Sequence, residues 1–231
     1  MASFSVLLLT AVPPGLAAEA GGAFVKIDGR EALLRSVELF LNRDNVKQIQ
    51  VCFRQDAMEE AKRKYAPHLS FSGVKVLAGG PRWIDQIAAA GERISADCTH
   101  VIVHDAARPA VAHGDIEAIM EAAEKHPVAT LVAASRGSLV EVDEGGNPLA
   151  FHEPARYVQL LTPQVFSKAK FEEMAGGRQD LHASQYHLVK GSPLNVRLSG
   201  PGDATLVKAM INLLPKPKVK GPQNPFEEAQ W

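Results

Sequence analysis

The residues best suited to carry chemistry stand together in the run His100–Pro109, HVIVHDAARP, where an apolar stretch leads directly into polar side chains. Ligands of open α/β sheets bind at the carboxyl ends of the strands, so we expect Asp105 to point into such a crevice. Its carboxylate could hold a divalent metal ion or a sugar hydroxyl. Arg108 could form two parallel charge-assisted bonds to a phosphate, while Ala106 and Ala107 would let the backbone approach the ligand closely.

The same run also has a purely structural interpretation. Asp105 could cap the turn that follows it, and Arg108 could form an ion pair within the fold. Phosphoryl transfer between ionised groups needs no strong base, so we expect His104 to make an orienting hydrogen bond. His182 and His187 are five residues apart without a third ligand at metal spacing, and we therefore assign no zinc site.

The elements that would position these residues follow from the hydrophobic spacing. Short apolar runs alternate with longer segments of helical period, which is typical of a parallel sheet covered by helices on both faces. We expect an α/β, Rossmann-like fold with a mostly parallel sheet. The expected strands are Ser5–Thr10, Gln48–Phe53, Val74–Leu77, His100–Val103, Ala129–Ala134 and Leu194–Leu198. The expected helices are Arg30–Leu41, Ala57–Tyr65 (charged and solvent-facing), Pro81–Ile94, Asp115–Lys125, Lys168–Met174 and Pro201–Leu213.

The pattern changes after Ala134, where the run SLVEVDEGGNPLAFHEP predicts a β-hairpin with its turn at Asp143–Pro148. Such an excursion often makes an arm, here about residues 138–156. The 231 residues, 46% of them hydrophobic, suffice for one substantial core, so we expect a single domain over residues 1–213. Residues 214–231 are rich in Pro and Lys, which predicts a disordered tail.

Composition excludes several classes of partner. The 25 Lys and Arg against 26 Asp and Glu give a net charge of -1, so no global basic field would gather nucleic acid or an anionic membrane. Cys52 and Cys98 lie in or beside apolar runs, which favours buried free thiols and a cytoplasmic location. The apolar run Val6–Leu9 has no Lys or Arg before it and is far shorter than a membrane span of roughly 20 residues. We expect it to form a buried first strand.

Two strings carry a family resemblance. VHDAARP at residues 103–109 and LTPQVF at residues 161–166 closely resemble the 2-C-methyl-D-erythritol 4-phosphate cytidylyltransferase family of the non-mevalonate isoprenoid pathway. Gly79-Gly80, the hairpin arm and the run LNVRLSGPGDATL occur in the matching order, so the resemblance covers roughly residues 4–213. HDAARP is fairly specific to this family and its ribitol-phosphate relatives, whereas Gly-Gly and TPQ are weak alone.

The resemblance implies a nucleotidyltransferase fold and a reaction in which a polyol phosphate attacks the α-phosphate of CTP and releases pyrophosphate. Mg²⁺ would carry much of the charge neutralisation, and the hairpin arm would be exchanged in a homodimer. Arg197 takes the place of a family Lys, which keeps the charge but alters the geometry. The assigned residues are Asp105, Arg108 and Arg197 for catalysis, with Asp105 also the metal ligand; Ala11, Gly15, Gly79, Gly80, Gln86 and Ala107 for the nucleotide; and Ala106, Arg108, Ser138 and Thr162 for the substrate.

The first loop departs from the family pattern, which is approximately Pro-Ala-Ala-Gly-x-Gly-x-Arg-Met followed by Pro-Lys-Gln. Such loops cradle phosphate because glycine lets backbone amides converge. Here Pro13 and Pro14 remove two amide donors, and the family lysine falls on Gly22. No Lys or Arg precedes Lys26, which we expect to be a surface lysine. Loss of an Arg and a Lys together could remove a factor of roughly 10⁴ in rate.

The base-reading element is changed as well. The family carries Gly-Gly, then Arg and Ser at fixed spacing to read cytosine, whereas this chain has Arg82 out of step and Gln86 near the expected Ser. Base recognition is therefore either lost or rebuilt with Gln86. Ser138 replaces the Thr expected after the fifth strand, and Arg156 lies close to the arginine expected after the arm.

Two functional hypotheses remain open. The first is an active nucleotidyltransferase with a divergent loop, which makes a CDP-alcohol from CTP and 2-C-methyl-D-erythritol 4-phosphate or a related polyol phosphate. The second is a catalytically degenerate paralogue that binds a phosphorylated ligand or a protein partner without turnover. A glycosyltransferase-like domain would need a metal-binding Asp-x-Asp at a strand end, and the chain has none.

Overall fold

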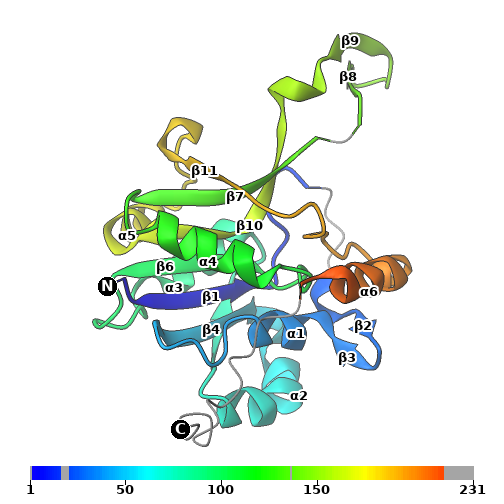
Figure 1. The fold of residues 1–231 in the computed structure, drawn as a ribbon. Coiled ribbons are helices and arrows are strands. Elements are labelled where there is room, and N and C mark those ends of the chain that lie inside the picture. The colour runs from blue at the N-terminus through cyan, green and yellow to red at the C-terminus, as the bar shows by residue number, and fades with distance from the viewer. Residues whose placement is uncertain (1, 17–20, 136, 216–231) are drawn as a thin grey trace, which may run out of the picture.

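The centre of the molecule is a large β-sheet. The structure is a computed structural model that describes residues 2–16, 21–135 and 137–215. The strands of the sheet are β1 (Phe4–Leu9), β4 (Val46–Arg54), β5 (Lys75–Gly79), β6 (His100–Asp105), β7 (Val128–Ala134), β10 (Val158–Ser167) and β11 (His187–Lys190). Their order is β11-β7-β10-β6-β1-β4-β5 (Figure 1). β10 runs antiparallel to β6 and β7, and the other neighbours are parallel, which confirms the expected mostly parallel sheet.

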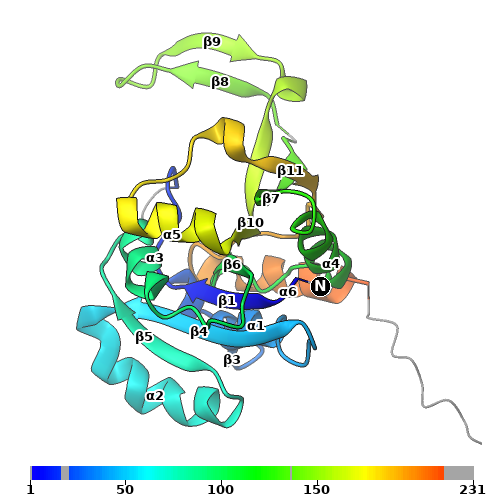
Figure 2. The ribbon, with the colours of Figure 1, turned by 90° about the vertical axis from the view of Figure 1, so that its left-hand side faces the viewer.

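Helices cover both faces of this sheet (Figure 2). The helices are α1 (Ala32–Glu38), α2 (Met58–Phe71), α3 (Trp83–Gly91), α4 (His113–Ala122), α5 (Lys168–Gly177) and α6 (Ala204–Leu213). On β1, Leu7 and Leu9 pack in one cluster with residues of α3 and α5, whereas Val6 and Leu8 pack in a second cluster with residues of α1, α2 and α4. Because β1 is buried on both faces, its sequence is a continuous apolar run rather than an alternation.

The strand expected at Leu194–Leu198 is wrong. Residues 191–200 form neither helix nor strand, because this segment leaves the sheet and crosses the carboxyl ends of its strands. There the N–H of Leu198 donates to Ala107 O at 2.9 Å. The last strand of the sheet, β11, lies just before this segment, in a stretch that hydrophobic spacing did not single out.

Two further elements differ from the expectation. The helix expected to end at Tyr65 continues to Phe71, and it is not wholly solvent-facing, because Ala61, Tyr65 and Leu69 are buried. The string TPQVF lies in β10, which was not expected as a strand. The first three residues of β10 are exposed and its later residues are buried, so this strand leads from the arm into the core.

The expected β-hairpin is confirmed. β8 (Leu139–Val142) pairs antiparallel with β9 (Pro148–His152), and the hairpin projects from the body of the molecule (Figures 1 and 2). In its turn, Asp143 Oδ1 accepts from the N–H groups of Gly145 and Asn147 at 2.9 and 2.8 Å. Of the expected tail, residues 216–231 lie outside the described part of the chain. No helix among the described residues is long and apolar enough to cross a membrane.

Candidate active site

The carboxyl end of β6 places Asp105 in a tight turn. The Ala107 N–H donates to Asp105 Oδ1 at 2.9 Å, and the Arg108 N–H donates to Asp105 O at 3.0 Å. The capping role considered for Asp105 is therefore present. The turn itself rests on helix α1, because the Ser36 hydroxyl donates to Ala106 O at 3.0 Å.

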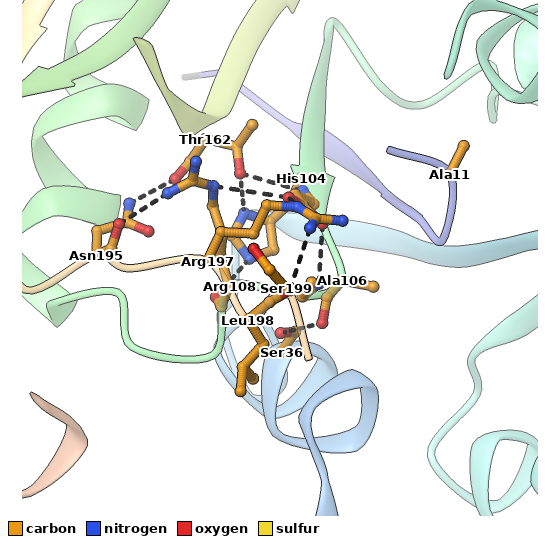
Figure 3. A network of polar contacts seen from close by, with 12 residues as sticks. Ala11, Ser36, His104, Ala106, Arg108, Thr162, Asn195, Arg197, Leu198 and Ser199 are labelled. Atoms are coloured by element: carbon orange, nitrogen blue, oxygen red, sulfur yellow. Dashed lines mark hydrogen bonds and ion pairs between the residues drawn. The ribbon is translucent and has the colours of Figure 1, made fainter. Parts of the chain in front are cut away.

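Two arginines flank the Asp105 carboxylate. Arg197 Nε lies 2.8 Å from Asp105 Oδ2, and Arg108 Nε lies 3.6 Å from the same oxygen. Burial raises the pKa of the Asp105 carboxyl above its ordinary value, although the charges of Arg197 and Arg108 oppose this shift. The three residues form a compact group with two positive charges and one negative charge, which leaves a net positive site. Arg108 and Arg197 lie close together in this group (Figure 3).

His104 and Thr162 tie β6 to β10 beneath this group. The Asp105 N–H donates to Thr162 Oγ1 at 3.1 Å, so the Thr162 hydroxyl is free to donate to His104 Nδ1 at 3.0 Å. His104 Nε2–H then donates to Arg108 O at 3.0 Å. This pattern requires neutral imidazole, and burial lowers the pKa of His104 to about 3. The orienting role expected for His104 is confirmed.

Asn195 joins the network and was not assigned a role from the sequence, which signalled it only through the run LNVRLSGPGDATL. Its Nδ2 donates to Thr162 O at 2.7 Å, and its backbone O accepts from Arg108 Nη1 at 2.8 Å. Asn195 Oδ1 and Arg108 Nε are buried and lack hydrogen-bond partners. Buried polar groups are nearly always satisfied, and Arg108 Nε has the Asp105 carboxylate 3.6 Å away, so among the described residues Asn195 Oδ1 is the atom of this network that is left without a partner.

A cavity of about 760 Å³ opens onto this network. Arg108, Thr162 and Arg197 line it on one side, and Gly15 with its neighbours in the first loop lines it on another. The remaining lining is largely apolar and includes Trp83. The cavity therefore lies at the carboxyl ends of the parallel strands, where open α/β sheets bind their ligands.

Comparison with known proteins agrees with this geometry. The model of the 2-C-methyl-D-erythritol 4-phosphate cytidylyltransferase family matches residues 12–212. The chain belongs to this family. Curated proteins with that name include one from Clostridioides difficile, 24% identical over 202 residues, covering 82% of this chain and 85% of that protein. Another, from Endomicrobium trichonymphae, is 28% identical over 162 residues, covering 68% and 72%.

Solved structures show the same fold. The 2-C-methyl-D-erythritol 4-phosphate cytidylyltransferase of Thermus thermophilus has a TM-score of 0.69 at 23% identity and covers 90% of this chain and 98% of that chain. The 4-diphosphocytidyl-2C-methyl-D-erythritol synthase of Anaerococcus prevotii has a TM-score of 0.72 at 15% identity, with coverage of 91% and 99%. The expected nucleotidyltransferase fold is confirmed.

The structure explains one departure from the cytidylyltransferase pattern. Gly22, where the sequence resemblance places the family lysine, lies in a short helical turn, η1 (Gly22–Phe24). A Cβ added to Gly22 would lie 1.8 Å from Leu198 O and 3.2 Å from Ala107 Cβ. No side chain fits in this packing, so the lysine has no place here. Lys26 is exposed on β2 (Lys26–Ile27), as expected for a surface lysine.

Of the residues assigned to the nucleotide, Gly15 lies at the cavity, whereas Ala11, Gly79 and Gly80 lie near Gln86 and α3. Gly15 lines the cavity beside Arg108. Ala11 stands apart from the Asp105 network (Figure 3), and its N–H donates to the side chain of Gln86 at 3.2 Å. Gly79 and Gly80 pack closely against α3: a Cβ added to Gly80 would lie 2.6 Å from Asp85 Cβ.

Ser138 is not brought to the network of its own chain. It lies at the root of the arm, is exposed and does not line the cavity. Arg156, on the 3-10 turn η3 (Pro154–Arg156), is likewise exposed at the other root of the arm. Within one protomer, the structure therefore separates both residues from Asp105.

A metal ion would have to share ligands with the substrate. The described residues contain no group of three or more His, Cys, Asp and Glu side chains able to hold a metal ion. Mg²⁺ commonly binds one or two carboxylates together with substrate phosphates and water. Asp105 offers one carboxylate, whose oxygens bind the Ala107 N–H and Arg197 in this structure, so its role as a metal ligand stays a prediction.

Proposed function

We propose that this protein transfers CMP from CTP to 2-C-methyl-D-erythritol 4-phosphate or a related polyol phosphate, with release of pyrophosphate. The observation that carries the proposal is a cavity lined by Arg108, Thr162 and Arg197, with the two arginines held by the buried carboxylate of Asp105, in a member of the cytidylyltransferase family. Family membership favours this function over the non-catalytic alternative.

The residues of the site suit a transfer between two anions. Arg108 and Arg197 would neutralise the attacking and reacting phosphates, because guanidinium groups bind phosphate oxygens through paired hydrogen bonds. Asp105 would hold the two arginines in place and accept from ligand hydroxyls. Thr162 and Asn195 would fix the orientation of Arg108 through the contacts described above. Bound Mg²⁺ would neutralise the charge that develops on the triphosphate, with Asp105 as its protein ligand.

Pyrophosphate release from CTP, Mg²⁺ and 2-C-methyl-D-erythritol 4-phosphate tests this function. Wild-type protein should release pyrophosphate, and Arg197→Met should lower the rate by about 10² to 10³ because one charge-stabilising contact is lost. Arg197→Lys, the matched control, keeps the charge and has the residue of the family pattern, so it should retain most of the activity. Absence of release by folded wild-type protein at high enzyme concentration, also with ribitol 5-phosphate, would contradict the proposal.

We further propose a homodimer formed by the hairpin arm. Val140 lies opposite Phe151, and Leu149 shares their face of the hairpin two residues from Phe151. Phe151 is 83% exposed. Two-stranded hairpins are marginally stable in water, so this apolar face needs cover. A second copy of the chain would provide it and could bring Ser138 to the partner's site.

Sedimentation velocity tests the dimer. Wild-type protein should sediment as a dimer and Phe151→Asp as a monomer, because a buried carboxylate would disrupt the apolar contact. Glu144→Gln, at the exposed turn of the hairpin, is the matched control and should remain dimeric. A wild-type monomer at micromolar concentration would contradict the arm as a dimer contact.

The buried, unpaired thiols of Cys52 and Cys98 support the proposal that the protein resides in the cytoplasm.

A further inference from the structure

Gln86 of α3 occupies an unusual place for a polar side chain, between the first loop and the end of β5. We infer that its carboxamide fills the nucleobase subsite by binding the backbone groups that would otherwise hold the edge of the base. This inference rests on the proposed binding of CTP. It changes the role of Gln86 from a residue that reads the base to one that the base must displace.

The contacts of Gln86 define the subsite. The residue is fully buried. Its Oε1 accepts from the N–H groups of Thr10 and Ala11 at 3.1 and 3.2 Å. Its Nε2 lies 3.5 Å from Gly80 O and from Thr10 Oγ1. The carboxamide therefore joins backbone groups that follow the carboxyl ends of β1 and β5.

The chemistry of these groups matches a pyrimidine edge. A carboxamide presents a carbonyl oxygen beside an NH₂ group, and cytosine presents ring acceptors beside its N4 amino donor. The two N–H donors of Thr10 and Ala11 and the acceptor Gly80 O complement either group. Ligands of open α/β sheets bind at this edge, so the subsite lies where a nucleotide base is expected.

The backbone beside Gln86 is tightly packed. A Cβ on Gly79 would lie 2.8 Å from Cys52 Sγ and 3.0 Å from Gln86 Cα, which shows that the backbone of α3 is held against β5. Gly79 and Gly80 also line an open cavity of about 480 Å³. The backbone of Gln86 is thus fixed, and only its side chain can leave the groups that it binds. Its two contacts at 3.5 Å are long for hydrogen bonds, so they resist displacement weakly.

A shorter side chain should open the subsite. Serine at position 86 removes the carboxamide and frees the N–H groups of Thr10 and Ala11. A typical internal hydrogen bond is worth a factor of about 2 to 10 in an equilibrium, so Gln86→Ser should bind CTP about tenfold more tightly than wild-type protein. Inorganic tripolyphosphate, which lacks a base, should bind both proteins equally.

Titration calorimetry with the full chain, Mg²⁺ and either CTP or tripolyphosphate measures these affinities. Tighter CTP binding with unchanged tripolyphosphate binding supports the inference. Equal or weaker CTP binding by Gln86→Ser overturns it, because Gln86 would then support the loop without occupying the subsite. Absence of CTP binding by both proteins overturns it as well.

Gln86→Met is the matched variant, because methionine fills the same volume without a carboxamide. It should bind CTP no more tightly than wild-type protein, and a gain equal to that of Gln86→Ser would overturn the inference. Pyrophosphate release separates this inference from the proposed function. If wild-type protein releases pyrophosphate but Gln86→Ser binds CTP no more tightly, the inference alone is overturned. If Gln86→Ser binds CTP more tightly but neither protein releases pyrophosphate, the inference is supported and the proposed function is contradicted.

Discussion

Acid should destabilise this protein through His104. The imidazole is buried and neutral, with Nδ1 accepting from Thr162 and Nε2–H donating to Arg108 O. A proton on Nδ1 would face the hydroxyl hydrogen of Thr162. The folded protein therefore resists protonation of His104, with a pKa of about 3, whereas the unfolded chain takes up the proton near 6.5.

The sign and size of the effect follow from this difference. Between these two pKa values the unfolded state binds one more proton than the folded state, so the free energy of unfolding falls as the pH falls. The slope approaches about 1.4 kcal/mol per pH unit. From pH 7 to pH 4.5, His104 alone should lower the free energy of unfolding by about 2.5 kcal/mol. The contribution of His104 is complete above pH 7.

Urea unfolding at half-unit steps between pH 7.5 and pH 4.5 measures this effect. His104→Gln retains a donor for Arg108 O and leaves the Thr162 hydroxyl without its acceptor, so it should be less stable at pH 7 by about 1 to 3 kcal/mol. Because the variant lacks the titrating group, its curve should be shallower. The advantage of wild-type protein over the variant should therefore change by about -2.5 kcal/mol between pH 7 and pH 4.5, and it reverses where it starts below that value.

The control is His68→Gln, which removes an exposed imidazole on α2 and should follow the wild-type curve. A constant difference between wild-type protein and His104→Gln across this pH range would refute the reasoning. It would mean that His104 is protonated in the folded protein or that its network opens at small cost.

Four other substitutions test the packing of the site. Asp105→Asn should destabilise by about 3 to 5 kcal/mol, because it leaves two buried arginines without their carboxylate, and Arg197→Met should cost less, because Arg108 stays beside Asp105. A double-mutant cycle in urea should show that the double variant loses much less than the sum, and additive losses would contradict the ion pair. Gly22→Ala should destabilise by about 1 to 3 kcal/mol, because its Cβ would overlap Leu198 O, and an unchanged melting temperature would contradict that close approach. Thr162→Val should cost about 1 to 3 kcal/mol by removing a hydroxyl that both accepts and donates in the buried network, and equal stability of the two proteins by calorimetry would show that the network contributes nothing.

Local patterns in the sequence predict much of this fold. The apolar runs at β1, β6 and β7 lie close to the strands observed, because each is buried on both faces and therefore largely hydrophobic. β4 was also expected, although it carries the buried polar residues Gln48 and Gln50. The hairpin was predictable from the turn Asp143–Pro148, since Asp, Gly and Asn form such turns through local contacts. The extent of a single domain and the nature of the tail at residues 214–231 remain predictions.

The edges of the sheet were less predictable. β11 is short and partly exposed, and hydrophobic spacing does not distinguish it from a loop. The segment Leu194–Leu198 has the composition of a strand, yet its polar groups bind Ala107, Arg108 and Thr162 instead of a neighbouring strand. The conformation of this segment depends on hydrogen-bond partners that are distant in the sequence, and local propensity does not predict such contacts.

The sequence by itself determined which residues could carry the chemistry, because the run HDAARP places an acid, two small residues and an arginine at the end of a buried strand. Only the tertiary structure decided how they are used. It pairs Asp105 with Arg197, 92 positions away in the sequence. It also places Asn195 beside Thr162 and lets the side chain of Gln86 bind the backbone of the first loop. The physical reason is that hydrogen bonds and ion pairs of buried groups depend on distances of a few ångströms, which the folded backbone sets and the order of residues does not.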